Sequence, residues 1–203
     1  KATLELKPLE VKNGIEITTP TTCYTSDAWT DTGVQTILPG GSRYETMMAS
    51  FAKMVAGEME NPYTLKTDEK GKHNSVKISS PELLWETRGW RVNEGPAVLY
   101  NEDDVYIVYS ASGFSSGSYC MGMLTLCGDD VMNPCHWAKS MTPVSFHKPV
   151  KNIYSAGHCS FLYRENGDIY MVYHANSTYK FDKSPRLTHI RKVEFAFGKP
   201  VLM

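Results

Sequence analysis

Residues 92–112 read VNEGPAVLYNEDDVYIVYSAS, and this stretch decides the fold. Gly95 and Pro96 disfavour a helix, and the apolar run directly after them predicts a buried strand. The polar residues 101–104 predict a hairpin turn, and the run VYIVY at 105–109 predicts the returning strand. The stretch therefore predicts an antiparallel hairpin, with Glu94 on the tight turn that precedes its first strand.

A second copy of this hairpin lies further along the chain. Residues 157–163 (GHCSFLY) lead into a polar turn and then into the run IYMVYHA at 169–175, which matches residues 105–111. Repetition at a spacing of roughly 60 to 70 residues, with several short strands in each unit, is typical of β-propeller blades. Because the chain also shows few helical periods, the predicted fold class is all-β.

Glu94 is the first candidate for chemistry. A carboxylate on a rigid turn where an apolar strand begins is well placed for a general acid, because apolar surroundings raise its pKa and the turn fixes where the proton is delivered. From the spacing alone, a solvated turn residue is the simpler interpretation. The turn by itself leaves both interpretations open.

Composition excludes several classes of protein. The 203 residues suffice for one substantial domain, and a net charge of −1 gives no electrostatic footprint for nucleic acid or an anionic membrane. No apolar run approaches the roughly 18 residues of a membrane span. The five cysteines form no Cys-x-x-Cys pair, so neither a zinc site nor a full disulfide framework is indicated. We expect free buried thiols, with one disulfide that involves Cys120 or Cys127 as the alternative.

The N-terminal part is organised differently from the rest. Pro39-Gly40-Gly41 predicts a boundary between an atypical segment, residues 1–41, and propeller blades at 42–203. Within the first segment Asp27 and Asp31 flank Trp29, a combination that could line a sugar subsite. A loop anchored by one tryptophan explains the same residues more simply.

Several motifs together resemble the family 43 glycoside hydrolases, which are five-bladed β-propellers acting on arabinose- and xylose-containing plant polysaccharides. The similarity extends from about residue 42 to 201 and is strongest over 92–197. The motifs are Asn93-Glu94-Gly95-Pro96, Tyr109-Ser110-Ala111-Ser112, Tyr119-Cys120-Met121-Gly122, Gly157-His158-Cys159-Ser160-Phe161, Val172-Tyr173-His174-Ala175 and His189-Ile190-Arg191.

The resemblance implies an inverting glycosidase in which Glu94 is the general acid. In such enzymes one carboxylic acid protonates the leaving oxygen while a carboxylate on the opposite side activates water. The family's base and its third carboxylate are aspartates of earlier blades, and neither has a matching position here. The resemblance accounts for about the last two and a half blades, so an incomplete, roughly half propeller is expected, with self-association as one way to complete it.

The resemblance also implies further site residues. His158 corresponds to a histidine near the propeller axis that faces a hydrated calcium ion and contacts it through water, although a core histidine explains it equally well. Arg191 corresponds to an arginine that points to the substrate pocket and could hold sugar hydroxyls, with a surface strand arginine as the alternative. Ser110, His174 and Trp90 are weaker candidates for substrate contact.

Two functions follow from these motifs. The first is a glycoside hydrolase of the α-L-arabinofuranosidase or β-xylosidase type that uses Glu94 as its acid. The second is a catalytically degenerate half-propeller that binds carbohydrate without turnover. Expected partners are a carbohydrate and a second copy of the chain, because an open half-propeller exposes strand edges and apolar surface. The expected protein is soluble, and the sequence leaves secreted and cytoplasmic locations open.

Overall fold

The computed structural model describes residues 21–26, 53–61, 64–102, 104–145, 147–179 and 185–202, and these residues confirm the all-β fold class. The helices among them are three short 3-10 turns: η1 Leu84–Glu86, η2 Pro134–His136 and η3 Pro149–Lys151. None of the helices in these parts of the chain has the length and hydropathy of a membrane span.

The strands form three antiparallel sheets and one small hairpin. The first sheet contains β1 Thr21–Ser26, β2 Lys53–Asn61, β3 Thr64–Leu65 and β4 Ser75–Ser79. The second contains β5 Asn93–Asn101, β6 Asp104–Ala111, β7 Cys120–Leu126 and β8 Trp137–Lys139. The third contains β9 Tyr154–Tyr163, β10 Ile169–Asn176 and β11 Arg186–Lys192. The hairpin pairs β12 Glu194–Ala196 with β13 Lys199–Val201.

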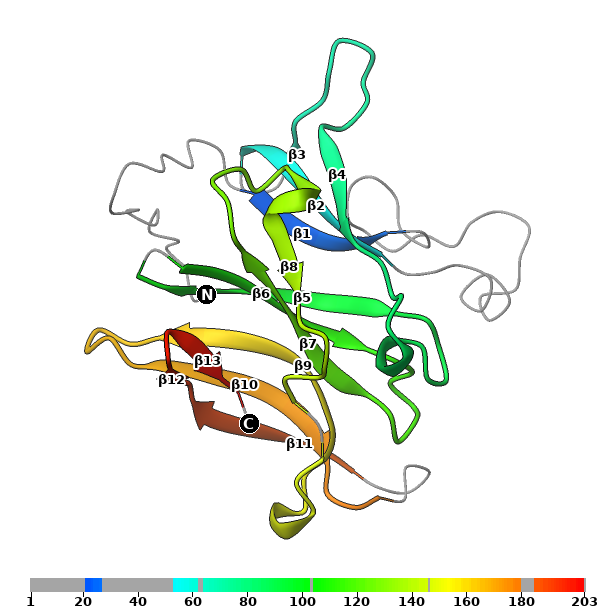
Figure 1. Cartoon of the computed structure of the whole chain (residues 1–203), viewed down its shortest axis with the longest axis vertical. Coiled ribbons are helices and arrows are strands. Elements are labelled where there is room, and N and C mark those ends of the chain that lie inside the picture. Colours follow the sequence, from blue (N-terminus) through cyan, green and yellow to red (C-terminus); the bar gives the residue numbers. More distant parts are fainter. Residues whose placement is uncertain are drawn as a thin grey trace, which may run out of the picture.

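The three sheets follow one another like the blades of a propeller (Figure 1). The first strands of the three sheets lie next to one another, since β5 contacts both β1 and β9. In Figure 1 the third sheet, in yellow and orange, lies below the green second sheet, and the blue and cyan strands of the first sheet lie above it. Propellers typically close with about 4 to 8 blades. The three blades in the described residues are therefore part of a ring, as the sequence predicts.

Strand β6 explains why residues 105–109 are apolar without alternation. Its side chains pack into two cores, because successive residues of a strand point to opposite faces. Tyr106 and Val108 belong to the core shared with the third sheet, whereas Ile107 and Tyr109 belong to the core shared with the first. A strand that is buried on both faces has no polar face to show in its sequence.

Both predicted hairpins are present. In the first, Asn101 pairs with Asp104 across a two-residue turn, and in the second, Ile169 pairs with Tyr163 across the turn at 164–168. The start of the first hairpin differs from the prediction, because Glu94 does not precede β5 but is its second residue. The small hairpin β12–β13 is bound to the second sheet, since Tyr106 Oη donates a hydrogen bond of 2.8 Å to the Gly198 carbonyl oxygen.

Candidate active site

Glu94 lies at an irregularity in the pairing of β5 with β6. Glu94 pairs with Ser110, but the next paired residue of β5 is Ala97, so the ladder is interrupted at Gly95 and Pro96. Gly95 has φ +54°, and a β-carbon there would lie 3.0 Å from two atoms of the His158 ring. Both observations favour a glycine at this position. At this bulge the half-buried Glu94 side chain reaches Tyr119, directly before β7.

Tyr119 holds the carboxylate of Glu94. Its hydroxyl donates a hydrogen bond of 2.8 Å to Glu94 Oε1, and the tyrosine is 1% exposed. Burial and the neighbouring Glu94 carboxylate raise the pKa of Tyr119, so the phenol keeps its proton and stays a donor. The ring fits because residue 157 is glycine: a β-carbon there would lie 2.1 Å from Tyr119 Cε1.

His158 and Ser110 join the second and third sheets beside Glu94. The His158 backbone N–H donates a hydrogen bond of 2.6 Å to Ser110 Oγ. His158 has φ +50°, a left-handed conformation that is unusual for a histidine, and its side chain is exposed. The structure therefore brings three of the predicted residues together, namely Glu94, Ser110 and His158.

His174 adds a fourth predicted residue. Its ring stacks on Tyr119 at 5.9 Å and 9°, and it lies 6.3 Å from the His158 ring. Burial, Arg186 and His158 together lower the pKa of His174 to about 4, so the ring is neutral at pH 7. His174 Nδ1 is buried and has no hydrogen-bond partner among the described residues.

Arg186 is a site residue that the sequence does not predict. Its guanidinium lies 5.7 Å from the centre of the Tyr119 ring and 5.3 Å from that of Phe114, and it donates to the Phe114 carbonyl. Phe114 in turn contacts Trp90 at 5.0 Å with the two rings at 70°. Trp90 thus reaches the site through Phe114 and Arg186. No sequence signal marks Arg186, because it belongs to none of the motifs.

Arg191 lies at a different level of the third sheet. It pairs with Met171, whereas His174 pairs with Thr188, which places Arg191 three residues further along β11. His189, two residues before it, stacks on Tyr173 at 5.3 Å. Contact between Arg191 and a substrate stays a prediction, and Arg186 is the arginine that the structure places beside Tyr119.

Calcium has few ligands in the described part of the site. Calcium takes about six to eight oxygen ligands. Beside His158 and Tyr119 the described contacts include one carboxylate, that of Glu94. The described residues contain no group of three histidine, cysteine, aspartate or glutamate side chains that could hold a metal. These residues alone do not fit a calcium cage, so the calcium ion stays a prediction.

Four cysteines of the described residues are free thiols. Cys120 and Cys159 are buried, as the sequence predicts, whereas Cys127 and Cys135 are exposed. Burial raises the pKa of both buried thiols to about 12, so neither is a reactive thiolate.

The arrangement can deliver a proton from a fixed direction. A single carboxylate is oriented by a neutral phenol and flanked by two histidines, an arginine and an aromatic pair. Such a set suits protonation of a leaving oxygen on a sugar, whose apolar face can pack on aromatic rings. No candidate for a catalytic base is identified in the described residues, and Asp27, Trp29 and Asp31 lie outside them.

Comparison with known proteins identifies relatives of this arrangement. Alpha-L-arabinofuranosidase 43 of Humicola insolens is 35% identical over 157 residues, which are 70% of this chain and 31% of that protein. The extracellular exo-alpha-(1→5)-L-arabinofuranosidase of Streptomyces avermitilis is 37% identical over 152 residues, 70% of this chain and 30% of that protein. The chain thus spans about a third of the length of these curated relatives.

Two solved structures are also similar to this chain. The crystal structure of alpha-L-arabinofuranosidase from Lactobacillus brevis matches with a TM-score of 0.65 and 35% identity, covering 75% of this chain and 47% of that one. A thermostable family-43 glycoside hydrolase matches with a TM-score of 0.66 and 25% identity, covering 90% of this chain and 53% of that one. The sequence model of the family described as glycosyl hydrolases family 43 matches residues 28–200. The chain belongs to family 43 of the glycosyl hydrolases.

Proposed function

We propose that this chain supplies the acid side of an inverting glycosidase that releases arabinosyl residues, with Glu94 as the general acid. The observation that carries the proposal is the hydrogen bond from Tyr119 Oη to Glu94 Oε1 at the bulge of β5. The arabinofuranosidases among the relatives favour an arabinosyl over a xylosyl substrate.

The chemistry follows from the orientation of Glu94. Because Tyr119 occupies Oε1, the proton of the acid form resides on Oε2, which is free to face the glycosidic oxygen. Oε2 donates this proton to the leaving oxygen as the bond to the anomeric carbon breaks. The Glu94 carboxylate that results accepts a stronger hydrogen bond from Tyr119 than the acid does, since hydrogen bonds to charged acceptors are stronger.

The opposite half of the reaction needs a carboxylate that takes a proton from the attacking water. We assign this base to a part of the molecule outside the described residues or to a second copy of the chain. The homo-oligomer belongs to this proposal, as does a calcium ion that His158 faces through water. The extracellular relative from Streptomyces favours a secreted protein.

Substitution of Glu94 tests the proposal directly. We expect the parent chain to cleave a nitrophenyl α-L-arabinofuranoside faster than the matching β-D-xyloside. On a phenyl α-L-arabinofuranoside, whose leaving group is poorer, we expect Glu94→Gln to lower turnover by about 10²- to 10⁴-fold. Glu102→Gln is the matched control, because Glu102 lies exposed in the hairpin turn at the other end of the same strand pair. Unchanged turnover in Glu94→Gln would contradict the proposal.

A second function rests on the described residues, which hold one oriented carboxylate, Glu94, and among which no candidate for a catalytic base is identified. A catalytically degenerate half-propeller would bind arabinose-containing oligosaccharides without cleaving them. Calorimetry with such an oligosaccharide separates the two functions: binding without turnover in both the parent and Glu94→Gln would establish the second function and exclude the first.

A further inference from the structure

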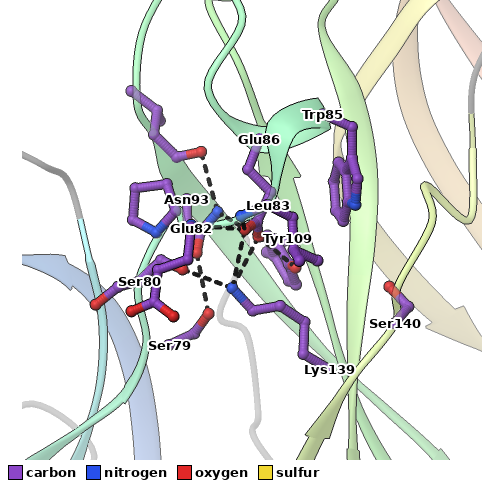
Figure 2. A network of polar contacts seen from close by, with 12 residues as sticks. Ser79, Ser80, Glu82, Leu83, Trp85, Glu86, Asn93, Tyr109, Lys139 and Ser140 are labelled. Carbon is purple, nitrogen blue, oxygen red and sulfur yellow. Dashed lines mark hydrogen bonds and ion pairs between the residues drawn. The ribbon is translucent and has the colours of Figure 1, made fainter.

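A buried carboxylate, Glu86, lies close to the acid but has no part in the proposed proton transfer. It is the last residue of η1 and is 0% exposed. Its oxygens accept hydrogen bonds from one cation, two neutral side chains and two backbone amides (Figure 2). The donors are Lys139 Nζ at 2.9 and 3.1 Å, Tyr109 Oη at 2.8 Å, Asn93 Nδ2 at 3.0 Å, and the backbone N–H groups of Glu82 and Leu83, each at 2.9 Å.

The charge of Glu86 is fully compensated. Burial alone raises the pKa of Glu86, but the hydrogen bonds from Lys139, the Leu83 amide and Tyr109, together with the charge of Lys139, outweigh burial and lower it. Glu86 is therefore ionised, and its acceptor sites are occupied from several directions. A buried charge held in this way has one defined geometry.

The same network ties the first sheet to the second. Lys139, on β8, also donates a hydrogen bond of 2.6 Å to the Ser80 carbonyl oxygen, directly after β4. Ser79, the last residue of β4, donates one of 3.0 Å to Asn93 Oδ1. Strands from two blades and the η1 turn thus meet at Glu86 and Asn93, as Figure 2 shows.

Asn93 connects this network to the acid. It immediately precedes Glu94 and is 0% exposed. Both polar atoms of its side chain are occupied: Oδ1 accepts from Ser79, and Nδ2 donates to Glu86 and to the Val92 carbonyl. Neighbouring residues of a strand point to opposite faces, so Asn93 is anchored on one face while Glu94 points to Tyr119 on the other.

Asn93 lies beside the interruption in the pairing of β5 with β6. The pairing of β5 with β6 is interrupted directly after Glu94, so regular ladder contacts hold the acid from one side only. A catalytic group must be held within about 0.5 Å of its productive position by locked neighbours. The network on the other face of β5 supplies such a hold.

We propose that Glu86 and Asn93 are positioning residues for Glu94: the charged network fixes the backbone at the bulge and thereby the direction in which Glu94 delivers its proton. This inference rests on the proposed role of Glu94 as the general acid. The competing explanation is that the network only joins two blades and has no specific effect on the acid.

The leaving group of the substrate distinguishes these explanations. A dinitrophenyl arabinofuranoside needs little protonation when its bond breaks, whereas a phenyl arabinofuranoside depends on the acid. A displacement of about 1 Å can cost about 10²-fold in rate. For Asn93→Ala we therefore expect kcat on the phenyl substrate to fall by about 10- to 100-fold and kcat on the dinitrophenyl substrate by less than about 3-fold.

The matched control is Leu124→Ala. Leu124 is 1% exposed in the same sheet and belongs to the core shared with the first blade, so its truncation also destabilises this region. Leu124→Ala should change both substrates by the same factor. Equal losses on the two substrates in Asn93→Ala would mean that the network is structural only, and would overturn the positioning role.

A second measurement does not depend on turnover. With carbon-13-labelled glutamate, the titration of the Glu94 carboxyl can be followed by NMR in the parent, Asn93→Ala, Glu86→Gln and Leu124→Ala, with Glu94→Gln identifying the resonance. We expect the Glu94 titration curve to move in the first two variants and to stay in place in Leu124→Ala. An unchanged curve in a folded Asn93→Ala protein would overturn the inference even if the chain shows no turnover.

These outcomes keep the two proposals apart. Suppose that Glu94→Gln removes turnover, while Asn93→Ala leaves the Glu94 titration curve unchanged and lowers kcat on both substrates equally. The role of Glu94 as the acid is then supported, and the positioning role is refuted. If Glu94→Gln leaves turnover unchanged, the acid role fails, and the NMR comparison alone decides whether the network controls the Glu94 carboxyl. Asn93→Ala is the main variant because Glu86→Gln leaves the half-buried Lys139 without its counter-charge and can prevent folding.

Discussion

Tyr119 orients the Glu94 carboxylate through its hydroxyl, whereas its ring fills space in the core. The ring packs against Gly157 and His174, whereas the hydroxyl alone reaches Glu94. Removing the hydroxyl therefore leaves the packing intact and frees the carboxylate to rotate.

We expect Tyr119→Phe to lower kcat by about 5- to 10-fold with little change in KM, because a hydrogen bond that stabilises the deprotonated acid is lost, at about 1 kcal/mol. Steady-state kinetics on a phenyl arabinofuranoside measure both constants. Tyr170→Phe, on β10 opposite Lys192, is the control and should behave like the parent. A rise in KM without a change in kcat would argue against this role.

His174 makes stability depend on pH. Its pKa is lowered from 6.5 to about 4 by burial and by the nearby Arg186 and His158. Between these two values the unfolded state binds more protons than the folded state, so this contribution to stability is present above pH 6.5 and is lost as the pH falls toward 4. The size is about 2 to 3 kcal/mol, since one pKa unit corresponds to about 1.4 kcal/mol and solvent screens part of the effect.

Urea unfolding at several values between pH 7 and pH 4 measures this effect. The parent should lose more free energy of unfolding over that range than His174→Gln, because glutamine does not titrate. Parallel curves for the two proteins would show that His174 does not carry the dependence.

At the scale of elements, the site depends on glycines that allow side chains of one blade to approach the strands of another closely. Gly157 in β9 is the clearest case, because the Tyr119 ring occupies the space that a side chain would need. The bulge at Gly95 is the second, since His158 lies against it.

Gly157→Ala is therefore expected to push the Tyr119 ring out of place, lowering the free energy of unfolding by about 1 to 3 kcal/mol and reducing kcat as well. Gly167→Ala is the control: nothing lies within 4 Å of its added β-carbon, although its φ of +84° makes alanine unfavourable there. It should lose stability by about 1 kcal/mol and keep kcat. Thermal unfolding combined with kinetics separates the two effects, and full activity in Gly157→Ala would refute the packing argument.

The same elements show what sequence reasoning could reach. The two hairpins were predictable because apolar runs and polar turns are local patterns, and Glu94, Ser110, His158 and His174 were found through motifs in those hairpins. The position of Glu94 inside β5 was not, because the bulge depends on pairing with β6.

Contacts between distant residues were also out of reach. The sequence marks Tyr119 only as the first residue of the motif Tyr119-Cys120-Met121-Gly122, and its bond to Glu94 spans 25 positions. Glu86 has no motif at all, since its side-chain partners come from three separate strands and become neighbours only when the sheet has formed around η1. Arg186 reaches Phe114 over 72 positions. Residues of this kind follow from topology, which a single sequence does not specify.

At the scale of the whole molecule, the three blades that the structure describes expose apolar side chains at one edge. Leu187 is 47% exposed and Ile190 is 66% exposed, and both lie on β11, the edge strand of the third sheet in the described residues. Three positions apart on a strand, they point to opposite faces, so each face of this edge carries one exposed apolar side chain. Edges of this kind pair with other chains unless they are protected.

We therefore expect the chain to self-associate, and Ile190→Lys to weaken that association, because a lysine on an edge strand opposes pairing. Sedimentation velocity over a range of concentrations measures the distribution of species. Val150→Lys, which also replaces an exposed apolar side chain by lysine but lies in η3 and not on a strand edge, is the control. A parent chain that sediments as a monomer at every concentration would exclude the two-copy version of the active site.

Burial of β6 on both faces has a consequence for synthesis. One face packs on strands made earlier, but the other packs on the third sheet, and Tyr106 binds Gly198, which lies 92 positions later. At about 5 to 20 residues per second, a ribosome needs roughly 5 to 18 s to cover that distance. During this interval the nascent chain carries a half-covered tyrosine-rich strand, an attractive target for a chaperone that binds apolar segments until the last blade arrives.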